Sequence, residues 1–588
     1  MKFEDYFQPA NVIKLLCKYR AKVALDRHKS HLLADISKSK KTIEDFKKKC
    51  LTPNEITKLL PPRRKWYKPN KDERAKFASS QKLQEYAINK TIKTEGLRIK
   101  SNITTKPDWY IGLDEFLKRI NERISNPSKE SIKQPKIVAI LKENTPSCKE
   151  CRPISLYDDL EDKIIISQTA KYLTDLFDPY FLDCSYAFRS VKGKKSPVTH
   201  HDTILKLCEY RSRHQSEDVY ASECDIQKFY DCLNHIEILN AFDEFQKRNH
   251  VIVHPSAVTF FKQYLDSYSF SKDVYPLNKS GYFKDKLLGC NFKWVEEELL
   301  TSFYPEQKEI GLSNLKIGVP QGGAISCFIS NLLLHSVDEG VIDKDDKELL
   351  YLRFCDDMVI LHSNKAKCEN ALERYKSKIK ELKILIHEPQ SFDEYSKQFW
   401  GKKLKSKKPY KWGARSKGEP CVPWLSFVGY NIKYDGSIRV RWKSIKKELK
   451  KQKEESKTVL TALNLDKSSL NATSKKSKRQ QVFALQQRLI SMSVGRISIF
   501  EERSQTLCWV NGFRALNGSK TALRQLRILD TNRTKVVKDF KKKLSKLTNP
   551  TIKPDIFNKS NLKFFGAPFS YHAFLRKKIV SRENNNPI

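Results

Sequence analysis

Short apolar runs rich in β-branched residues alternate with helical stretches between about residue 131 and residue 440. Three such runs are KIVAIL (136–141), DVYASECDI (218–226) and YLRF with MVILH (351–362). Their length and composition are typical of buried strands. Residues 1–130 are lysine-rich and mostly helical in pattern, and the pattern becomes helical again after Arg441. The alternation therefore predicts a mixed helix-and-strand core with helical regions on either side.

The chain carries a large excess of positive charge. Lysine and arginine total 111 residues against 69 aspartate and glutamate residues, which gives a formal net charge of +42 over 588 residues. A chain with this charge repels itself unless a polyanion neutralises it, so nucleic acid is the expected partner. The hydrophobic share of 39% still supplies a sizeable core, and the length suggests more than one packed unit.

The sequence carries no sign of a membrane segment. No apolar run approaches the ~20 residues of a membrane span, and acids and lysines interrupt the N-terminal region where a signal peptide needs an unbroken apolar stretch. The fourteen cysteines form no disulfide framework, and the CxxC pair of Cys148 and Cys151 has no second pair nearby in the sequence. We therefore expect reduced thiols, no structural zinc and a cytoplasmic protein.

Three aspartates stand where predicted strands end. Asp225 follows an extended run and precedes a helical one, and Asp356 and Asp357 lie between two short strands, as at the tip of a hairpin. Adjacent carboxylates at a turn are often simply solvated. However, two Mg²⁺ ions ~3.5–4 Å apart need shared carboxylates, because one ion activates the attacking oxygen and the other holds the leaving phosphate. Carboxylates at neighbouring strand ends can supply that bridge.

The segment GVPQGGAISCFISNLLL (318–334) combines a glycine-rich turn with the start of a helix. Gly318, Gly322 and Gly323 lack side chains, so the backbone at these positions can approach a flat base or a sugar closely. The alternative explanation is an ordinary turn followed by a helix N-terminus. The position of this segment between the two acidic segments is distinctive.

Together, these segments resemble the palm motifs of reverse transcriptases, and the closest pattern is that of bacterial enzymes related to group II intron and retron reverse transcriptases. The matching segments are DIQKFYD (225–231), GVPQGGAISCFISN (318–331) and FCDD (354–357). Supporting segments are RPI (152–154), SYAFR (185–189), which resembles the SYGFR of group II intron enzymes, and FVGY (427–430), which is similar to the primer-grip motif. The resemblance covers residues 136–450 in order.

The resemblance implies a fold and a reaction. The fold is that of a right-hand polymerase of the α+β class, with fingers, palm and thumb and with additional helical N- and C-terminal segments. The expected domains are a basic helical extension (1–130), fingers and palm (131–440), a helical thumb (441–549) and a C-terminal extension (550–588). The reaction is RNA-directed DNA synthesis, in which a 3′ hydroxyl is extended with dNTPs by two Mg²⁺ ions, for which Mn²⁺ can substitute.

The resemblance also implies roles for individual residues. Asp225, Asp356 and Asp357 match the catalytic, metal-binding aspartates, and Ile226 adjoins them in the metal site. The residues that match nucleotide or template contacts are Lys142, Arg152, Tyr230, Gln321, Gly322 and Phe354, and those of the primer grip are Phe427, Gly429 and Tyr430. Tyr230 matches the steric gate beneath the sugar 2′ position. The cations of Lys142 and Arg152 suit the triphosphate, because pyrophosphate departure needs positive charge on the leaving oxygens.

Two positions depart from the family pattern. Phe354 replaces the usual tyrosine of the YxDD box. The segment HEPQS lies where many relatives place a lysine that protonates the leaving pyrophosphate. Gln390 cannot do this, which leaves His387, Lys397 or water as the acid. Arg189 is expected to touch backbone or to pack within the fingers.

The sequence lacks several features of other reverse transcriptases. It shows no HNH-like cluster of cysteine and histidine and no recognisable set of nuclease acids after the thumb region. The chain therefore resembles the stand-alone, defence-associated "unknown group" reverse transcriptases, many of which act against phage and some with a dedicated non-coding RNA. The resemblance implies a structured non-coding RNA as the template, dNTPs as substrates and DNA as the product.

Three other functions compete with this one. An RNA-making polymerase usually has a GDD turn, and the bulky Tyr230 argues for deoxynucleotides. A non-catalytic, maturase-like RNA-binding protein is marked by loss of the catalytic acids, all three of which are present here. A template-independent or protein-primed DNA polymerase of the abortive-infection type stays open, because 24 tyrosines offer too many candidate primers.

The C-terminal region is rich in aromatic residues. They include Phe564, Phe565, Phe569, Tyr571 and Phe574. Such residues indicate a packing surface, which either caps the chain's own core or joins copies of the chain in a homo-oligomer.

Overall fold

The chain folds as two compact units. The computed structural model describes residues 2–37, 54–77, 80–145, 148–190, 198–278, 290–292, 302–304, 315–391, 404–415, 421–464, 478–494, 513, 515–516, 518–546 and 569. The first unit comprises Met1–Val12, Phe116–Val428 and Lys433–Gly436, and the second comprises Ile13–Glu115, Gly429–Ile432 and Ser437–Ile588.

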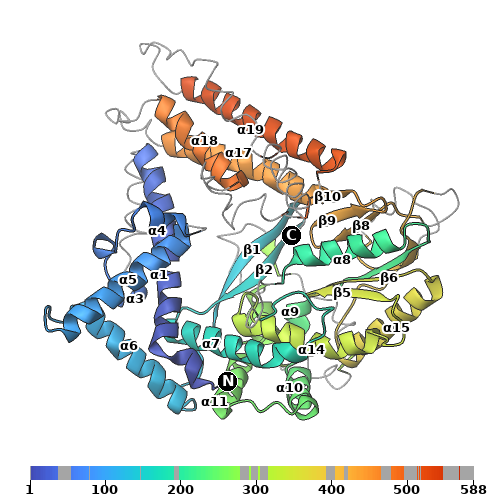
Figure 1. Cartoon of the computed structure of the whole chain (residues 1–588), viewed down its shortest axis with the longest axis horizontal. Helices are drawn as coiled ribbons and strands as arrows, with labels where there is room; N and C mark the ends of the chain where they lie inside the picture. Colours follow the sequence, from blue (N-terminus) through green and yellow to red (C-terminus); the bar gives the residue numbers. More distant parts are fainter. Residues whose placement is uncertain are drawn as a thin grey trace, which may run out of the picture. The chain divides into compact units, whose positions relative to one another are not determined.

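The first unit mixes helices and strands, as the sequence predicts (Figure 1). Its helical elements are η1 (Glu4–Phe7), α7 (Leu160–Phe177), η3 (Asp178–Tyr180), α8 (His200–Arg213), α9 (Phe229–Cys232), α10 (His235–Asn249), α11 (Pro255–Asp266), η4 (Phe270–Val274), η5 (Tyr275–Asn278), α14 (Ala324–Val341) and α15 (Lys365–Glu381). Its strands are β1 (Lys136–Thr145), β2 (Cys148–Leu156), β3 (Tyr220–Cys224), β4 (Cys290–Asn291), β5 (Leu350–Phe354), β6 (Asp357–His362), β7 (Lys407–Lys411) and β8 (Trp424–Phe427).

A four-stranded sheet with the order β5-β6-β3-β7 forms the centre of this unit. All its pairs are antiparallel, and the register of β3 on β6 runs from Tyr220 opposite His362 to Cys224 opposite Met358. Most residues of the central strands β3 and β6 are buried, and α15 packs against both strands. The strands predicted at 218–226 and 351–362 are thus confirmed.

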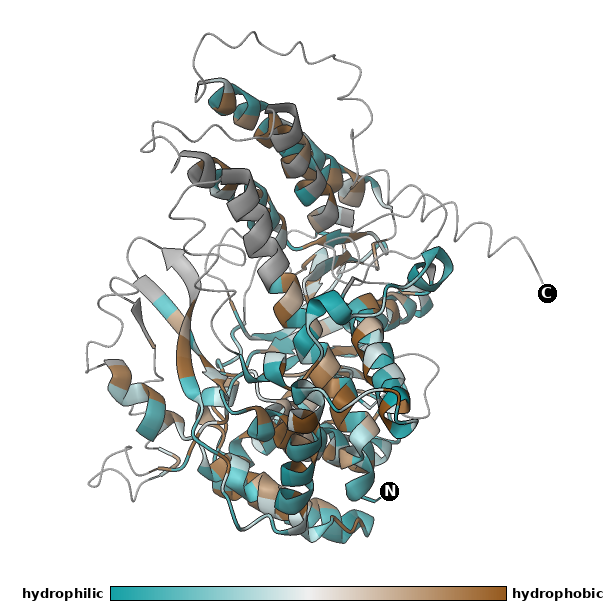
Figure 2. Cartoon of the chain, turned by 90° about the vertical axis from the view of Figure 1, so that its left-hand side faces the viewer, coloured by the Kyte–Doolittle hydropathy of each residue, from teal (hydrophilic) through white to brown (hydrophobic). Residues whose placement is uncertain are grey.

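Helix α15 shows how the sequence covers this sheet. Its buried residues recur every three or four positions and are Cys368, Ala371, Leu372, Tyr375 and Ile379. This spacing places them along one face of a helix, and α15 packs against β3, β6, β7 and α14. Its remaining positions are mostly charged, so hydrophilic and hydrophobic residues alternate along the helix, as the colours of Figure 2 show for the surface helices in general.

The β1-β2 hairpin forms a second sheet with β4. Its antiparallel register runs from Lys136 opposite Leu156 to Thr145 opposite Cys148, with a β-bulge between Leu141 and Glu143. Cys151 in β2 is buried and disulfide-bonded, and its partner lies outside the described side chains. The expectation that all cysteines are reduced is therefore wrong at this residue. Sequence spacing alone does not reveal which cysteines meet in space.

The lysine-rich segment 402–418 contains a strand, although its many lysines, interrupted by glycine and proline, are typical of a basic loop. Within its described part, Lys407–Lys411 form β7, which pairs with β3. Glu223 makes this possible, because its carboxylate lies 2.6 Å from Lys407 Nζ and accepts a hydrogen bond of 2.5 Å from the Tyr410 hydroxyl. A mostly buried counter-charge thus replaces the apolar pattern that normally marks a strand.

The second unit is mostly helical. Its elements, including two helices that continue from or into the first unit, are α1 (Pro9–Ser37), α3 (Glu55–Lys58), η2 (Arg63–Lys65), α4 (Lys71–Ala75), α5 (Ser80–Lys100), α6 (Asp108–Ser125), β9 (Tyr430–Lys433), β10 (Ile438–Val440), α17 (Trp442–Asn464), α18 (Lys478–Val494) and α19 (Lys520–Lys546). The helical patterns predicted at both ends of the chain are confirmed in these described elements. None of the described helices is both long enough and apolar enough to cross a membrane.

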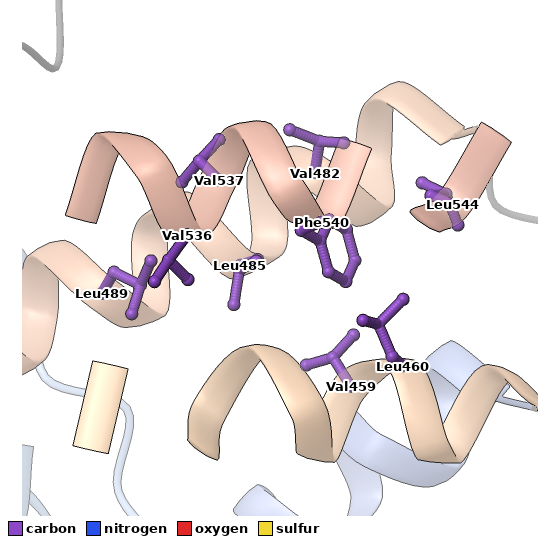
Figure 3. Packing of buried hydrophobic residues seen from close by; sticks show 9 residues of the cluster. All are labelled: Val459, Leu460, Val482, Leu485, Leu489, Val536, Val537, Phe540 and Leu544. Atoms are coloured by element: carbon purple, nitrogen blue, oxygen red, sulfur yellow. The ribbon is translucent and has the colours of Figure 1, made fainter. Parts of the chain in front are cut away.

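Helices α17, α18 and α19 lie side by side and share an apolar cluster (Figure 3). The cluster consists of Val459, Leu460, Val482, Leu485, Leu489, Val536, Val537, Phe540 and Leu544. Phe569 belongs to a neighbouring cluster with Val440 and Leu529, and its backbone N–H donates to Asp530 Oδ1 at 3.1 Å. At this described residue, the C-terminal region covers the chain's own core.

Candidate active site

The strand ends bring two of the predicted aspartates together. Cys224, the last residue of β3, pairs with Met358 of β6. Continuing this antiparallel register by one residue places Asp225 opposite Asp357, and side chains of opposite residues project to the same face of a sheet. Phe354 of β5 pairs with Asp357 of β6, so Cys355 and Asp356 form the turn between these strands. The predicted placement of the three acids at strand ends is confirmed.

Arg353 stabilises the turn that carries Asp356. Arg353 is fully buried, and its Nε and Nη2 atoms donate to the two carboxylate oxygens of Asp338 on α14, at 2.7 and 2.6 Å. Its Nη1 atom donates to the Cys355 carbonyl at 3.1 Å. Cys355 has a φ of +61°, in the left-handed region that side chains rarely adopt. The buried arginine therefore helps to keep a strained turn in one conformation.

Asp225 is fixed by contacts from distant parts of the chain. Its backbone N–H donates to Ser406 Oγ at 2.8 Å, and its carbonyl accepts from the His387 N–H at 2.9 Å. Its Oδ2 atom lies 3.6 Å from both His387 Nε2 and Lys405 Nζ. Lys405 Nζ is also 2.7 Å from His387 Nε2, and because an ammonium only donates, this imidazole nitrogen accepts.

Of the candidate acids for pyrophosphate, the structure therefore places His387 at the site. Lys397 lies outside the described residues. Sequence reasoning missed Lys405, whose position beside Asp225 follows from the pairing of β7 with β3 and from no local signal in the sequence.

The donor atoms at this end of the sheet are carboxylate oxygens, with the backbone carbonyl of Ile226 next to them in the chain. Hard cations such as Mg²⁺ and Mn²⁺ prefer oxygen ligands, so the chemistry of this set fits those ions. Asp225 already lies close to two groups that can carry positive charge. Within the described part of the chain, no three His, Cys, Asp or Glu side chains are close enough together to form a ready-made metal cage.

Tyr230 reaches the same turn from the other side. Its hydroxyl lies 3.2 Å from the Cys355 sulfur. Burial, followed by the nearby Cys355, raises the pKa of Tyr230 well above its ordinary value, so the hydroxyl stays protonated. The ring packs edge-on against Phe229, at 5.1 Å between centroids, yet is only partly buried, whereas Phe229 is fully in the core.

The loop before α14 lies directly against α9. The Val319 N–H donates to the Tyr230 carbonyl at 2.8 Å. Gln321 Nε2 donates to the buried Asp231 carboxylate at 2.6 Å. The loop is thus bonded to two consecutive residues of α9: Val319 binds Tyr230, and Gln321 binds Asp231. Asp231 belongs to the DIQKFYD motif, but sequence reasoning gave it no role.

The glycines of this loop differ in what an added side chain would meet. A Cβ atom on Gly318, whose φ is +89°, would lie 2.7 Å from Phe270 Cβ, and one on Gly323 would overlap the Tyr264 hydroxyl. At these two positions packing within the protein by itself requires glycine, and the approach of a base or sugar stays a prediction. Gly322, with a φ of +93°, has only Ile154 Cγ2 nearby, at 3.8 Å.

The two predicted triphosphate cations lie on the β1-β2 hairpin. Arg152 is exposed on β2, opposite Ile140. Three residues further along, the Ser155 N–H donates to the Gln321 carbonyl at 3.1 Å, which ties this hairpin to the glycine-rich loop. Lys142 lies at the β-bulge of β1, and its side chain is outside the described structure.

Phe354 and the predicted primer-grip residues differ in how deeply they are buried. Phe354 is half-buried, with its ring centroid 6.0 Å from that of His200. Phe427 is buried in the first unit. Gly429 and Tyr430 belong to the second unit, where Tyr430 is fully buried, so its side chain is a core residue there.

Arg189 is a structural residue, as expected. Its Nε atom donates to Asp178 Oδ1 at 2.5 Å, and its guanidinium also donates to the carbonyls of Asp178, Phe181, Leu182 and Ser185 at 2.8–3.2 Å. It therefore fixes the backbone of the SYAFR segment.

Comparison with known proteins identifies the central part of the chain. Residues 140–390 match the family described as reverse transcriptase (RNA-dependent DNA polymerase). No curated protein matches the chain. Among solved structures, the chain is similar to apo telomerase from Candida tropicalis (12% identity, TM-score 0.32, covering 77% of this chain and 73% of that one). It is also similar to telomerase from Candida albicans in complex with a fragment of telomeric RNA (12% identity, TM-score 0.29, covering 76% and 71%).

The matched segment contains both acidic motifs and the glycine-rich loop between them. Residues 140–390 are therefore a reverse transcriptase domain, and the chain is an RNA-directed DNA polymerase, a nucleotidyltransferase.

Proposed function

We propose that this chain extends a 3′ hydroxyl with dNTPs on an RNA template, with Asp225, Asp356 and Asp357 holding two Mg²⁺ ions. The observation that carries the proposal is the register of β3 on β6, which puts Asp225 opposite Asp357 and beside the turn of Asp356. The reverse transcriptase match over residues 140–390 supports the same reaction.

The divalent ions, when bound, supply an activated attacking oxygen and a positive charge on the leaving phosphate. The chain's own residues position the substrates. Tyr230, held beside the catalytic turn, presents its ring to the sugar and disfavours a 2′-hydroxyl. Gln321, oriented by Asp231, and the open backbone at Gly322 line the nucleotide and the template base. Arg152, exposed on β2, contributes positive charge toward the triphosphate.

In terms of domains, the proposal assigns fingers and palm to residues 131–440, the thumb to 441–549, and helical extensions to 1–130 and 550–588. The side chains of Phe427 and Tyr430 are buried, which indicates that a primer grip at Phe427, Gly429 and Tyr430 would use the backbone of this turn. Lys142 is assigned to the triphosphate by its motif alone.

The biological setting that we propose is antiphage defence with a dedicated, structured non-coding RNA as template. The charge of +42 supports an extensive contact with RNA phosphates. The proposal includes a cytoplasmic location and leaves room for a homo-oligomer, although the buried Phe569 favours a C-terminal region that packs on its own chain.

A matched pair of variants tests the catalytic assignment. Asp356→Asn removes one predicted metal ligand, whereas Asp345→Asn removes an exposed carboxylate from the same domain. In primer extension on an RNA template with Mg²⁺, we expect Asp356→Asn to lose at least about 10³-fold in rate, equivalent to several kcal/mol of transition-state stabilisation. Asp345→Asn keeps the wild-type rate. Near-wild-type extension by Asp356→Asn would contradict the proposal.

A further inference from the structure

We propose that Phe188 is a stacking platform for a base of the single-stranded RNA template close to the point of nucleotide insertion. This inference rests on the proposed function and adds to it a template-binding residue that the motifs do not assign. Four observations carry it: the backbone conformation of Phe188, the exposure of its ring, the rigidity of its neighbours and its position relative to the catalytic turn.

Phe188 adopts a conformation that a phenylalanine normally avoids. Its φ is +55°, in the left-handed region, which for a bulky residue is a true outlier. Such a conformation costs free energy and persists only where the surroundings enforce it. A glycine at this position would relieve the strain, so the retained aromatic ring calls for a use.

The ring of Phe188 is exposed although its neighbours are buried. Phe188 is 42% exposed, whereas Ala187 and Ser190 are 1% and 6% exposed. A buried ring would explain the strain by its contribution to the core, but this ring contributes little to it. The geometry instead presents an apolar, flat surface to whatever occupies the space in front of it.

The backbone around Phe188 is held by several independent contacts. Asn331 Nδ2 on α14 donates to the Ala187 carbonyl at 2.8 Å, and the Ser190 N–H donates to Asp178 Oδ1 at 3.0 Å. The Arg189 guanidinium binds four carbonyls and the Asp178 carboxylate in addition. The ring is therefore displayed from a rigid base, which lowers the entropy cost of binding a ligand.

The segment that carries Phe188 runs beside the catalytic hairpin. Ser185 pairs in parallel with Arg353 of β5, the Arg353 N–H donates to the Cys184 carbonyl at 2.8 Å, and the Tyr186 N–H donates to the Arg353 carbonyl at 3.0 Å. Phe188 follows Ser185 by three residues, and Asp356 follows Arg353 by three residues. Both residues therefore lie within three positions of the same Ser185–Arg353 bridge.

An exposed, rigid aromatic ring on a segment bonded to the catalytic hairpin suits an unpaired nucleobase. Every base has a flat π-face, so stacking tolerates any template sequence, as copying requires. Unpaired RNA bases are commonly recognised in this way. A base already paired in the product duplex has its faces covered by its neighbours and gains little from such a ring.

The test compares two nucleic acid probes that differ only in an unpaired template base. One is an RNA–DNA primer–template with a 5′ RNA overhang, and the other is the same duplex with a blunt end. We expect Phe188→Ala and Phe188→Gly to weaken binding of the overhang probe about tenfold, as for the loss of one base stack, and to leave the blunt duplex unchanged. Phe188→Trp keeps the affinity for both probes.

The controls separate stacking from folding. Phe188→Gly relieves the strained backbone while removing the ring, so it folds even if Phe188→Ala does not. Tyr180→Ala removes another aromatic ring of the same unit that is 43% exposed, and it leaves both affinities unchanged. A 2-aminopurine at the first unpaired template position loses its stacking signal in Phe188→Gly but not in Tyr180→Ala.

Equal affinities of wild type and Phe188→Gly for the overhang probe would overturn the stacking role, as would an equal loss for both probes. A failure of the proposed function looks different, because the wild-type protein then extends neither probe whatever residue 188 is.

Discussion

The contacts that Arg353 makes next to the catalytic turn are polar and directional, whereas the contacts between α17, α18 and α19 are apolar. Arg353 is buried with Asp338 and donates four hydrogen bonds, to Asp338, Asn331 and Cys355. The helical cluster of the second unit contains only aliphatic side chains and Phe540 (Figure 3). Hydrogen bonds fix positions to fractions of an ångström, and apolar burial stabilises in proportion to area without fixing direction. The bonds of Arg353 thus fix the geometry of the catalytic turn, and the apolar cluster stabilises the second unit.

Removal of divalent ions should distinguish the roles of the two regions most strongly. Chelation of divalent ions should lower primer extension by at least about 10³-fold, and added Mg²⁺ or Mn²⁺ should restore it. The melting temperature should hardly change, because Asp225, Asp356 and Asp357 lie at partly or fully exposed strand ends rather than in the core. Parallel assays of extension and thermal melting check this expectation. A large loss of stability on chelation would show that the ions serve the fold instead.

The next largest effect is expected from Arg353→Met, which leaves the Asp338 carboxylate buried without its partner. Breaking a buried ion pair in this way costs about 3–5 kcal/mol of unfolding free energy. Arg248→Met is the matched control, because Arg248 pairs with Glu339, next to Asp338 on α14, but at the surface. We expect that control to cost less than about 1 kcal/mol in chemical denaturation. Equal costs for both variants would mean that the buried pair does not hold the turn.

Phe540→Ala tests the other region. Phe540 is fully buried between α17, α18 and α19, and its truncation leaves a cavity that costs about 3–4 kcal/mol. Calorimetry should show the loss in the transition of the second unit, while Lys543→Ala, an exposed position on the same helix, changes little. If the cluster only stabilises, folded Phe540→Ala still incorporates a single nucleotide at low temperature. A rate loss as severe as that of Asp356→Asn would break the distinction between the regions.

The smallest effect that we predict concerns sugar choice. Tyr230→Ala should raise the ratio of rATP to dATP incorporation about tenfold or more, because an unpaired buried hydroxyl accounts for roughly 1–3 kcal/mol of discrimination and the steric clash adds to it. Single-nucleotide extension with matched dATP and rATP measures the ratio, and Tyr230→Phe serves as the control that keeps the ring. An unchanged ratio in an active Tyr230→Ala variant would reopen the case for an RNA-making polymerase.

The elements of the site that are local in sequence could be predicted. The strands before Asp225 and around Asp356 were predictable because each combines an apolar run with a polar end, and the hairpin register then follows from the short turn. The helices at both ends of the chain were predictable from their spacing of apolar residues. These features depend on neighbours within a few positions.

The rest depends on partners far away in the chain. Lys407–Lys411 form a strand because Glu223, 184 residues before Lys407, supplies a counter-charge. Lys405 lies beside Asp225 because it precedes this strand by two residues. The need for glycine at 318 and 323 arises from Phe270 and Tyr264. No local pattern encodes such contacts.

The most direct test of the central claim is to sequence the product made on a defined RNA. The purified protein is given a heteropolymeric RNA annealed to a DNA primer, four dNTPs and Mg²⁺, with parallel reactions that lack the RNA or contain RNase from the start. The account predicts DNA complementary to the RNA, and no product in either control. DNA of the same amount and composition without RNA would contradict it and would instead support template-independent synthesis.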